Sequence, residues 1–210
     1  SYIKGDPGQV DTRYVKTSNA FSSYVNEGMV VISTLDKTTN SETRHVMLGC
    51  QAPDNYIQFG YSVFISSVPN KKVLLVGAPG ASSDAGVVYA YDVHYTRSFD
   101  GLTLTVTATN TSYNSITPPV SATSGDRFGE QIVGTTDGSM VAISAPNIGT
   151  VGKVYVYTFN STTVNYDLLQ TIHYNDTPYI STFSNFASSI SMDDAGQWLF
   201  ISAYNADDGI

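Results

Sequence analysis

The chain has 210 residues and a formal net charge of -8, with 15 Tyr and 9 Phe against one Trp. Its 10 Lys and Arg residues are scattered and do not supply the clustered positive charge that sequence-independent nucleic-acid binding needs, so we expect no nucleic-acid partner. No apolar run approaches the roughly 18 residues of a membrane helix, and the lone Cys50 cannot form an intrachain disulfide.

The predicted secondary structure consists of short β-strands joined by turns. Continuously apolar runs bounded by turn residues are typical of strands that are buried on both faces. The predicted strands lie, in chain order, at 28–32, 44–49, 73–77, 86–91, 102–107, 141–144, 152–157, 167–172 and 198–202. Residues 1–20 do not read as inner strands preceding the first of these. No stretch has a convincing helical period.

Three stretches of the chain repeat one pattern in the same order. Each opens on a Phe followed by Gly or Ala, continues into an apolar run, and ends that run on a small residue followed by Ala. The opening residues are Phe59, Phe128 and Phe186, and the closing triplets are Gly77-Ala78-Pro79, Ser144-Ala145-Pro146 and Ser202-Ala203-Tyr204. An internal repeat fixes the architecture before any residue is assigned a chemical role.

The strands within each repeat are expected to form one four-stranded antiparallel sheet. Asp137-Gly138 predicts a tight hairpin of type I′, which needs positive φ at both central residues. The segments that start at Gly86 and Gly152 alternate aliphatic and aromatic residues, which places Val on one sheet face and Tyr on the other. A sheet with two apolar faces must stack against copies of itself, so we predict an all-β fold built as a β-propeller.

The repeat resembles a known family. Phe-Gly, then Gly-Ala-Pro, then Gly-x-Val-Tyr-x-Tyr is the pattern of FG-GAP repeats, which form the propeller of integrin α subunits. The chain resembles more closely the non-integrin branch of this family, which occurs in microbial and viral surface proteins. The first repeat matches well, the second carries Ser144-Ala145-Pro146, and the third departs further, with Phe186-Ala187 and Tyr204 in place of Pro. The resemblance implies a propeller of four-stranded blades and a surface protein.

The blade boundaries follow from the repeat. We expect complete blades at 59–127 and 128–185, partial blades at 28–58 and 186–210, and an N-terminal segment or linker at 1–27. Because propellers typically have about four to eight blades, the chain is expected to be an incomplete portion of a longer one. The alternative is that the strands at 28–50 complete the last blade of another subunit and close a ring of subunits.

No strong cofactor or catalytic site is predicted. Calcium needs about six to eight oxygen ligands, and no turn here matches the Asp-x-Asp-x-Asp-Gly loop that integrin-type repeats often carry. The densest acidic loop supplies weak metal candidates, Asn205, Asp207 and Asp208, with a solvated turn as the alternative. A sialidase-type, glycan-processing propeller enzyme is less favoured because its site needs an Arg cluster, and this chain has four separated Arg residues. We expect no enzymatic activity.

The function expected from these features is non-enzymatic adhesion or recognition, located extracellularly, on a cell surface or on a virion surface. Loops carried by a rigid scaffold are the usual recognition elements, and the candidate loops are 79–86, 147–152 and 204–209. Asp84, Asn147 and Tyr204 are the candidate contact residues, and for Tyr204 packing between blades is the favoured interpretation. The partner would be a protein or glycan ligand. The alternative function is a structural subunit of an extracellular or viral assembly, such as a fibre, spike or filament, with neighbouring subunits as partners.

Overall fold

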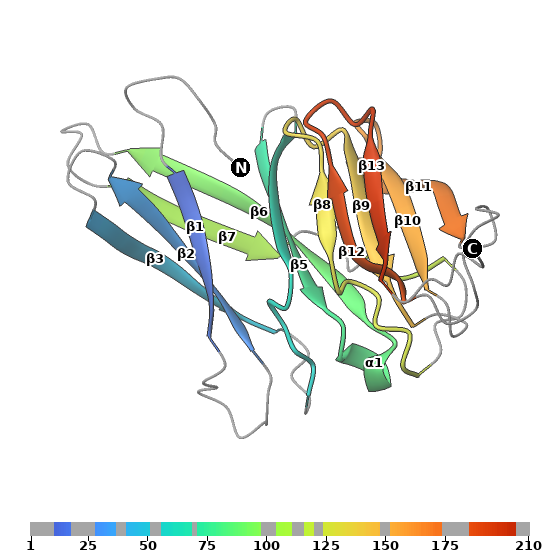
Figure 1. Ribbon diagram of the computed structural model, residues 1–210. Coiled ribbons are helices and arrows are strands. Elements are labelled where there is room, and N and C mark those ends of the chain that lie inside the picture. Colours follow the sequence, from blue (N-terminus) through green and yellow to red (C-terminus); the bar gives the residue numbers. More distant parts are fainter. Residues whose placement is uncertain are drawn as a thin grey trace.

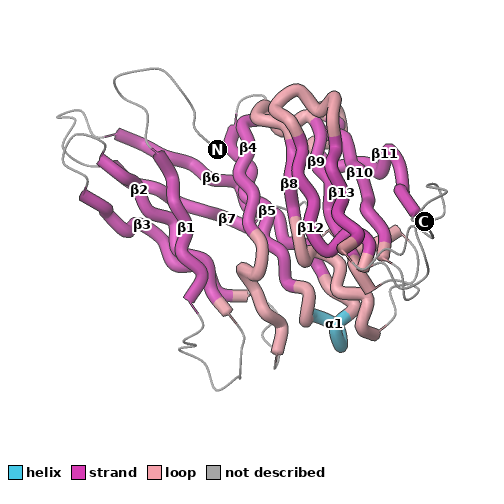
Figure 2. Tube along the Cα trace, viewed as in Figure 1, coloured by secondary structure: helices cyan, strands magenta, loops and turns pink. Residues whose placement is uncertain are grey.

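The computed structural model of the chain is built from β-strands in antiparallel sheets (Figures 1 and 2). It describes residues 11–17, 28–36, 41–50, 56–68, 71–97, 104–110, 116–119, 124–147, 152–173 and 185–204. The strands are β1 (Asp11–Thr17), β2 (Met29–Asp36), β3 (Ser41–Gly49), β4 (Val63–Val68), β5 (Lys71–Ala78), β6 (Val87–Arg97), β7 (Leu104–Asn110), β8 (Ile132–Gly134), β9 (Met140–Ala145), β10 (Lys153–Asn160), β11 (Asn165–His173), β12 (Phe186–Met192) and β13 (Leu199–Ala203). Within this part of the chain, α1 (Ala81–Asp84) is the one helical element. The predicted all-β class is confirmed.

Each sheet pairs strands that follow one another in the sequence. The orders are β1-β2-β3, β4-β5-β6-β7, β8-β9-β10-β11 and β12-β13, and every named pair is antiparallel. Thus β4–β7 and β8–β11 form the two complete four-stranded sheets that the repeat predicts. Within the described residues the four sheets do not close into a ring.

The N-terminal strand β1 differs from the sequence-based expectation. Residues 1–20 do not predict an inner strand, yet β1 pairs with β2 along its whole length, from Asp11 opposite Leu35 to Thr17 opposite Met29. The reason lies in its composition, because only Tyr14 and Val15 are apolar and they are adjacent. A strand without alternating apolar residues gives no period-two signal, so pairing with β2 decides its conformation.

The turn between β8 and β9 also differs in detail. The amide of Thr135 donates a hydrogen bond to the carbonyl of Met140 at 3.0 Å, so the loop is wider than two residues. Gly138 has φ +71, but Asp137 is not among the residues with positive φ, which excludes the predicted type I′ turn. Instead the Asp137 carboxylate accepts hydrogen bonds from the amide and the hydroxyl of Ser139, at 2.9 and 2.8 Å. These bonds hold the turn and lower the pKa of Asp137.

The sheets stack face to face, and both faces of the middle sheets are buried. In β5, Leu74 and Val76 pack toward β2, whereas Val73 and Leu75 pack against the β8–β11 sheet. The same division occurs in β9, where Ala142 packs toward the β12–β13 sheet. This burial explains why these strands read as continuous apolar runs rather than as alternating ones.

The third strand of each complete sheet carries Tyr on one face and aliphatic residues on the other, as predicted. In β10, Tyr155 and Tyr157 pack against the β4–β7 sheet, while Val154 and Val156 face the β12–β13 sheet. In both sheets the Tyr face looks toward the preceding sheet, because Tyr91 of β6 packs in the cluster that includes β2. The two complete sheets therefore stack in the same orientation.

The same backbone contact joins every pair of successive sheets. A glycine just before the second or third strand of one sheet touches the Phe that opens the next repeat, so closely that a Cβ atom would lie about 2 Å from the Phe carbonyl oxygen. The three junctions and the Cβ-to-oxygen distances are Gly28 to Phe59 at 2.1 Å, Gly86 to Phe128 at 2.1 Å and Gly152 to Phe186 at 2.0 Å. All three glycines have φ between +82 and +87. Each position therefore requires glycine for both space and backbone conformation.

The buried Tyr face makes alkaline pH destabilising. Burial raises the pKa of Tyr155 to about 12, and it also raises the pKa of Tyr91 and Tyr157 above the ordinary value. In the unfolded chain these hydroxyls ionise near pH 10, whereas in the folded chain they stay protonated. The contribution of these protonated hydroxyls to the free energy of unfolding is therefore fully present below pH 10. It is lost as the pH rises toward the folded-state pKa values.

Tyr157→Phe is expected to raise the free energy of unfolding by about 1 kcal/mol at pH 7 and to reduce its loss above pH 10. The Tyr157 hydroxyl is buried and has no hydrogen-bond partner among the described residues, so removing it relieves a desolvation cost. Urea unfolding at pH 7 and pH 11 measures both effects. Tyr204→Phe, at an exposed position, is the matched control and is expected to change neither value. A Tyr157→Phe variant that is less stable at pH 7 would contradict this account.

Candidate contact surface

Five segments gather at one end of the stacked sheets, the end that carries α1 in Figure 1. They precede or open the first strand of a sheet or connect its second and third strands, and backbone contacts link them. The segments are 56–62, 79–86, 124–131, 146–147 and 185–189. For example, the Gly80 amide donates to the Ile57 carbonyl at 3.0 Å, and the Arg127 amide donates to the Asp84 carbonyl at 2.8 Å. We call this end the loop surface.

The most distinctive part of the loop surface is the turn at α1. Ser82, Ser83 and Asp84 have φ of 54, 60 and 63, so three successive residues with side chains lie in the left-handed region. Each costs roughly 1–2 kcal/mol relative to an ordinary conformation. All three are exposed, so burial of their side chains does not offset this cost. Such strain persists only where the surroundings fix the backbone.

The next repeat supplies that fixation. Two successive amides of the segment before β8 donate to the turn, Arg127 to the Asp84 carbonyl at 2.8 Å and Phe128 to the Ala85 carbonyl at 3.1 Å. Inside the turn, the Gly86 amide donates to the Ala81 carbonyl at 2.9 Å. The turn is thus closed on itself and bonded to the neighbouring sheet, which presents its exposed side chains on a fixed backbone.

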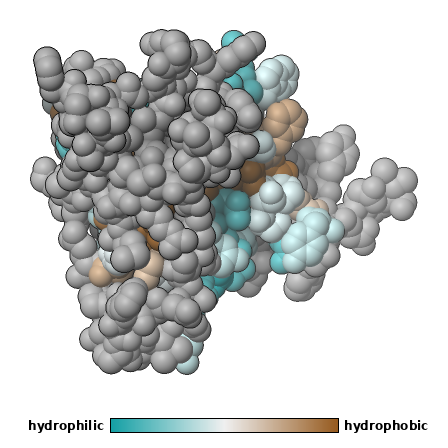
Figure 3. All heavy atoms as spheres, turned by 90° about the vertical axis from the view of Figure 1, so that its left-hand side faces the viewer, coloured by the Kyte–Doolittle hydropathy of each residue, from teal (hydrophilic) through white to brown (hydrophobic). Residues whose placement is uncertain are grey.

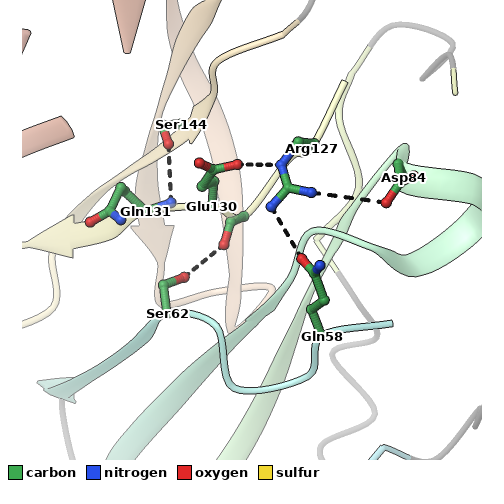
Figure 4. A network of polar contacts seen from close by, with 8 residues as sticks. Gln58, Ser62, Asp84, Arg127, Glu130, Gln131 and Ser144 are labelled. Carbon is green, nitrogen blue, oxygen red and sulfur yellow. Dashed lines mark hydrogen bonds and ion pairs between the residues drawn. The ribbon is translucent and has the colours of Figure 1, made fainter. Parts of the chain in front are cut away.

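Arg127 connects three segments of the loop surface (Figure 4). Its Nε donates to Oε2 of Glu130 at 2.5 Å and its Nη2 donates to Oε1 of Gln58 at 3.1 Å. Its Nη1 lies 3.9 Å from Oδ1 of Asp84, and its guanidinium carbon lies 5.5 Å from the centre of the Tyr61 ring. Burial lowers the pKa of Arg127, but the hydrogen bond and charge of Glu130, with Tyr61 and Asp84, raise it above its usual value overall.

A second polar contact fastens the sheets beside this network. The Ser62 hydroxyl donates to the Gly129 carbonyl at 2.7 Å, and the Gln131 amide donates to the Ser144 hydroxyl at 3.0 Å (Figure 4). The first bond joins two sheets and the second lies within one hairpin. Both groups are scaffold elements, because each hydroxyl is bonded to a backbone group of the repeat.

Arg127→Lys is expected to lower the free energy of unfolding by about 1–2 kcal/mol, because an ammonium cannot donate in the same fork to Glu130 and Gln58. The Arg127 side chain is only 22% exposed, so water replaces those bonds poorly. Urea unfolding at pH 7 measures the loss. Lys72→Arg is the control, since the exposed Lys72 ammonium makes one bond to the Ser67 hydroxyl and is expected to matter by less than about 0.5 kcal/mol. Equal losses in the two variants would contradict the assigned role of Arg127.

Of the residues singled out from the sequence, Asp84 and Asn147 lie on the loop surface, and Tyr204 lies outside its five segments. Asp84 faces Arg127 and its side chain is 52% exposed. Asn147 is exposed in the turn after β9, and Tyr204 is 71% exposed after β13. They belong to three successive sheets and do not converge on one cleft. The weak metal candidates Asn205, Asp207 and Asp208 lie outside the described residues.

Sequence reasoning missed two exposed aromatic residues of this surface. Tyr56 is 57% exposed and Tyr61 is 38% exposed, on either side of the Phe59 that opens the first repeat. Their signal was weak because the chain contains 15 Tyr, so two of them outside the predicted strands do not stand out. The second repeat has Gly125 and Glu130 at the equivalent positions. Only this comparison marks the two tyrosines as departures from the shared pattern.

The described residues show no other obvious site. Among them, no group of three or more His, Cys, Asp or Glu side chains could hold a metal ion. A cavity between β5, β6 and the β10–β11 hairpin, lined by Val73, Ala90, Ile116, Phe159 and Tyr166, has a volume of only about 10 Å³, which is room for one water molecule. No helix in the part of the chain that the structure describes is long and apolar enough to cross a bilayer.

Comparison of the chain with models of known protein families and with the sequences of curated proteins gives no match. The chemistry of the loop surface is therefore the basis for a function. It combines exposed Tyr, Ser and Asp side chains on a backbone held by hydrogen bonds. Such a surface can contact a ligand through aromatic rings and short polar groups.

Proposed function

We propose that the chain is part of a β-propeller of the FG-GAP type and serves as a non-enzymatic adhesion or recognition module, exposed on a cell or virion surface. The propeller assignment is supported by the two meandering four-stranded sheets and by the matching face-to-face stacking. It is also supported by the Phe-on-Gly contact at three successive junctions. In a propeller, such junctions repeat around an axis and place equivalent loops on one face.

The observation that carries the recognition proposal is the strained, exposed turn at Ser82, Ser83 and Asp84. Strain of this kind is retained where a fixed backbone has a use, and contact loops are one such use. Tyr56 is adjacent, because a Cβ on Gly80 would lie 1.8 Å from the Tyr56 carbonyl oxygen. Tyr and Ser on a rigid backbone are the residues that recognition surfaces favour, since they give contact area at low entropic cost. The ligand is a protein or a glycan.

The proposal is tested by placing one bulky charge on the turn. Ser83→Arg keeps the left-handed position occupied by a residue with a side chain, so it leaves the fold intact while blocking the loop surface. Ser161→Arg is the matched control, because Ser161 is equally exposed but lies in the β10–β11 turn, at the other end of the sheets. The 210-residue chain and both variants are titrated against glycan arrays and against intact cells.

We expect the unmodified chain and Ser161→Arg to bind the same targets, and Ser83→Arg to bind them at least about tenfold more weakly. Circular dichroism checks that both variants keep the β-sheet spectrum. Equal binding by the two variants would place the contact elsewhere, and an absence of binding to every glycan and cell type would remove the recognition proposal.

A structural role in an extracellular or viral assembly is the second candidate. The observation in its favour is the exposed aromatic pair at the start of β13, where Trp198, just before the strand, and Phe200, within it, are 66% and 65% exposed. Large exposed apolar side chains on one sheet face are typical of surfaces that other polypeptides cover. A fixed stoichiometry of the chain in purified particles, together with no ligand binding by the loop surface, would favour this role.

A further inference from the structure

The outer face of the β12–β13 sheet has no covering sheet in the described part of the chain. Its aromatic residues are Trp198, the only Trp of the chain, and Phe200. The opposite face of the same sheet is packed, because Phe186, Ile190 and Ile201 belong to the cluster shared with β9 and β10. Figure 3 views the molecule from the opposite side, where β1–β3 lie, and there the coloured hydrophobic and hydrophilic residues lie next to one another.

Strand register shows what this exposed face corresponds to in the other sheets. Ile190 pairs with Ile201 in the same way that Val63 pairs with Val76, and Ile132 with Ile143. Phe200 precedes Ile201, just as Leu75 precedes Val76 and Ala142 precedes Ile143. Phe200 is therefore equivalent to Leu75 and Ala142, both 0% exposed. Trp198 stands at the position of Val73, which is 2% exposed. The equivalent residues are buried by the following sheet.

The junction between the first two repeats shows how a following sheet docks on the equivalent face. At the junction between the first two, the Phe128-Gly129 turn lies against Gly77, where a Cβ would be 2.1 Å from the Gly129 oxygen. The Ser62 hydroxyl, at the edge of that contact, donates to the Gly129 carbonyl at 2.7 Å. At this junction the following sheet is thus held by apolar burial and by one hydroxyl-to-carbonyl bond.

The third repeat retains the hydroxyl that makes this bond. Ser189 occupies the position of Ser62, three residues after the opening Phe, and it is exposed. Its amide donates to the Ser202 hydroxyl at 2.9 Å, just as the Gln131 amide donates to Ser144 at 3.0 Å, so the hairpin has the same geometry. Ser189 and Phe200 therefore present both parts of the docking site.

We propose that the β12–β13 face is a docking surface for a polypeptide that carries a further unit of the same repeat, inserted by its Phe-Gly turn beside Ser189 and over Phe200 and Trp198. A second copy of this chain does not fit this role, because its turns at Phe59, Phe128 and Phe186 already rest on Gly28, Gly86 and Gly152. The proposal extends the propeller part of the proposed function and is independent of ligand binding by the loop surface.

The test uses the 210-residue chain and a synthetic peptide with the sequence of residues 126–145, which contains the Phe128-Gly129 turn and the two strands that follow it. Trp198 reports binding directly, because it is the only Trp and is exposed in the free chain. The fluorescence spectrum and its quenching by iodide are recorded during titration. A peptide with Phe128 replaced by Ala is the matched control ligand.

We expect saturable binding with a blue shift of Trp198 emission and reduced quenching, and binding at least about tenfold weaker for the Phe200→Ser chain and for the control peptide. Ser189→Ala should weaken binding by a smaller factor, about threefold to tenfold, through loss of one hydrogen bond. Leu169→Ser, which changes an exposed residue of β11, and Ser83→Arg on the loop surface should bind normally. Normal binding by Ser83→Arg separates this proposal from the recognition function.

Three results would overturn the proposal. The first is an unchanged Trp198 spectrum at saturating peptide, and the second is equal binding by the Phe200→Ser and Leu169→Ser chains. The third is self-association of the free chain that Phe200→Ser abolishes in sedimentation equilibrium, since this would assign the face to a second copy. We expect every variant to fold, because all the altered side chains are exposed. Circular dichroism of each variant checks this.

Discussion

Gly86→Ala is expected to lower the free energy of unfolding by about 3–5 kcal/mol, or to prevent folding. A Cβ at this position would lie 2.1 Å from the carbonyl oxygen and 2.4 Å from the amide nitrogen of Phe128. Both are backbone atoms, so the contact cannot be relieved by rotating a side chain. Because Gly86 joins the two complete sheets, the substitution would have to separate them. Urea unfolding of the purified variant at pH 7 measures the loss.

Substitutions at two other glycines distinguish the effect of the close contact at Gly86 from the effect of backbone strain. Gly125 has φ +94, close to the φ +87 of Gly86, but a Cβ there meets nothing within 4 Å. Gly125→Ala is therefore expected to cost only about 1–2 kcal/mol, which is the strain alone. Gly49 also has open space and no positive φ, so Gly49→Ala should stay within about 0.5 kcal/mol of the unmodified chain. If Gly86→Ala and Gly125→Ala cost the same, the sheet junction does not depend on close approach.

Phe128→Ala is expected to cost about 3–5 kcal/mol, the second of the large effects. The ring is 0% exposed and packs edge-on against Tyr155, with centroids 5.6 Å apart, inside the cluster between the two complete sheets. Truncation leaves a cavity that β9 and β10 cannot close, because each of these strands is hydrogen-bonded to a neighbour on both sides. Phe59 makes the equivalent contact with Tyr89 at 5.7 Å in its own repeat.

Phe200→Ala is the matched control for Phe128→Ala. It removes the same side chain from an exposed sheet face, and we expect a change of less than about 1 kcal/mol in the free energy of unfolding. Denaturant unfolding of both variants, with equal slopes against urea concentration, makes the comparison valid. Similar losses for the two variants would mean that Phe128 is not part of a buried junction.

Much of the fold could be predicted from the sequence because the repeat and the strand patterns agree. The runs at 73–77 and 141–144 lie within β5 and β9, and the Tyr–aliphatic alternation after Gly152 places two separate faces in two clusters. These patterns are local and depend only on the two-residue period of a strand. By contrast, β1 lacks that period and is held by pairing with β2, which no local pattern reveals.

The contact surface was less predictable, because its geometry depends on contacts between repeats. The loop that contains Asp84 was identified from its position between strands, but its left-handed turn was not, since Ser has no special preference for φ near +60 and one Asp does not predict three successive residues there. The turn is fixed by amides of Arg127 and Phe128, far along the chain. Likewise, no pattern in the sequence connects Arg127 with Gln58, which only stacking of the sheets brings together.

The central claim is that the segments opening at Phe59, Phe128 and Phe186 dock on the preceding sheet by one shared contact. The most direct measurement is nuclear Overhauser spectroscopy of the isotopically labelled chain, reading the α-protons of Gly28, Gly86 and Gly152. The account predicts cross-peaks from each glycine to its own Phe, in the pairs Gly28–Phe59, Gly86–Phe128 and Gly152–Phe186. Cross-peaks at one junction without equivalents at the other two would contradict the shared contact, and with it the repeated stacking on which the proposed function depends.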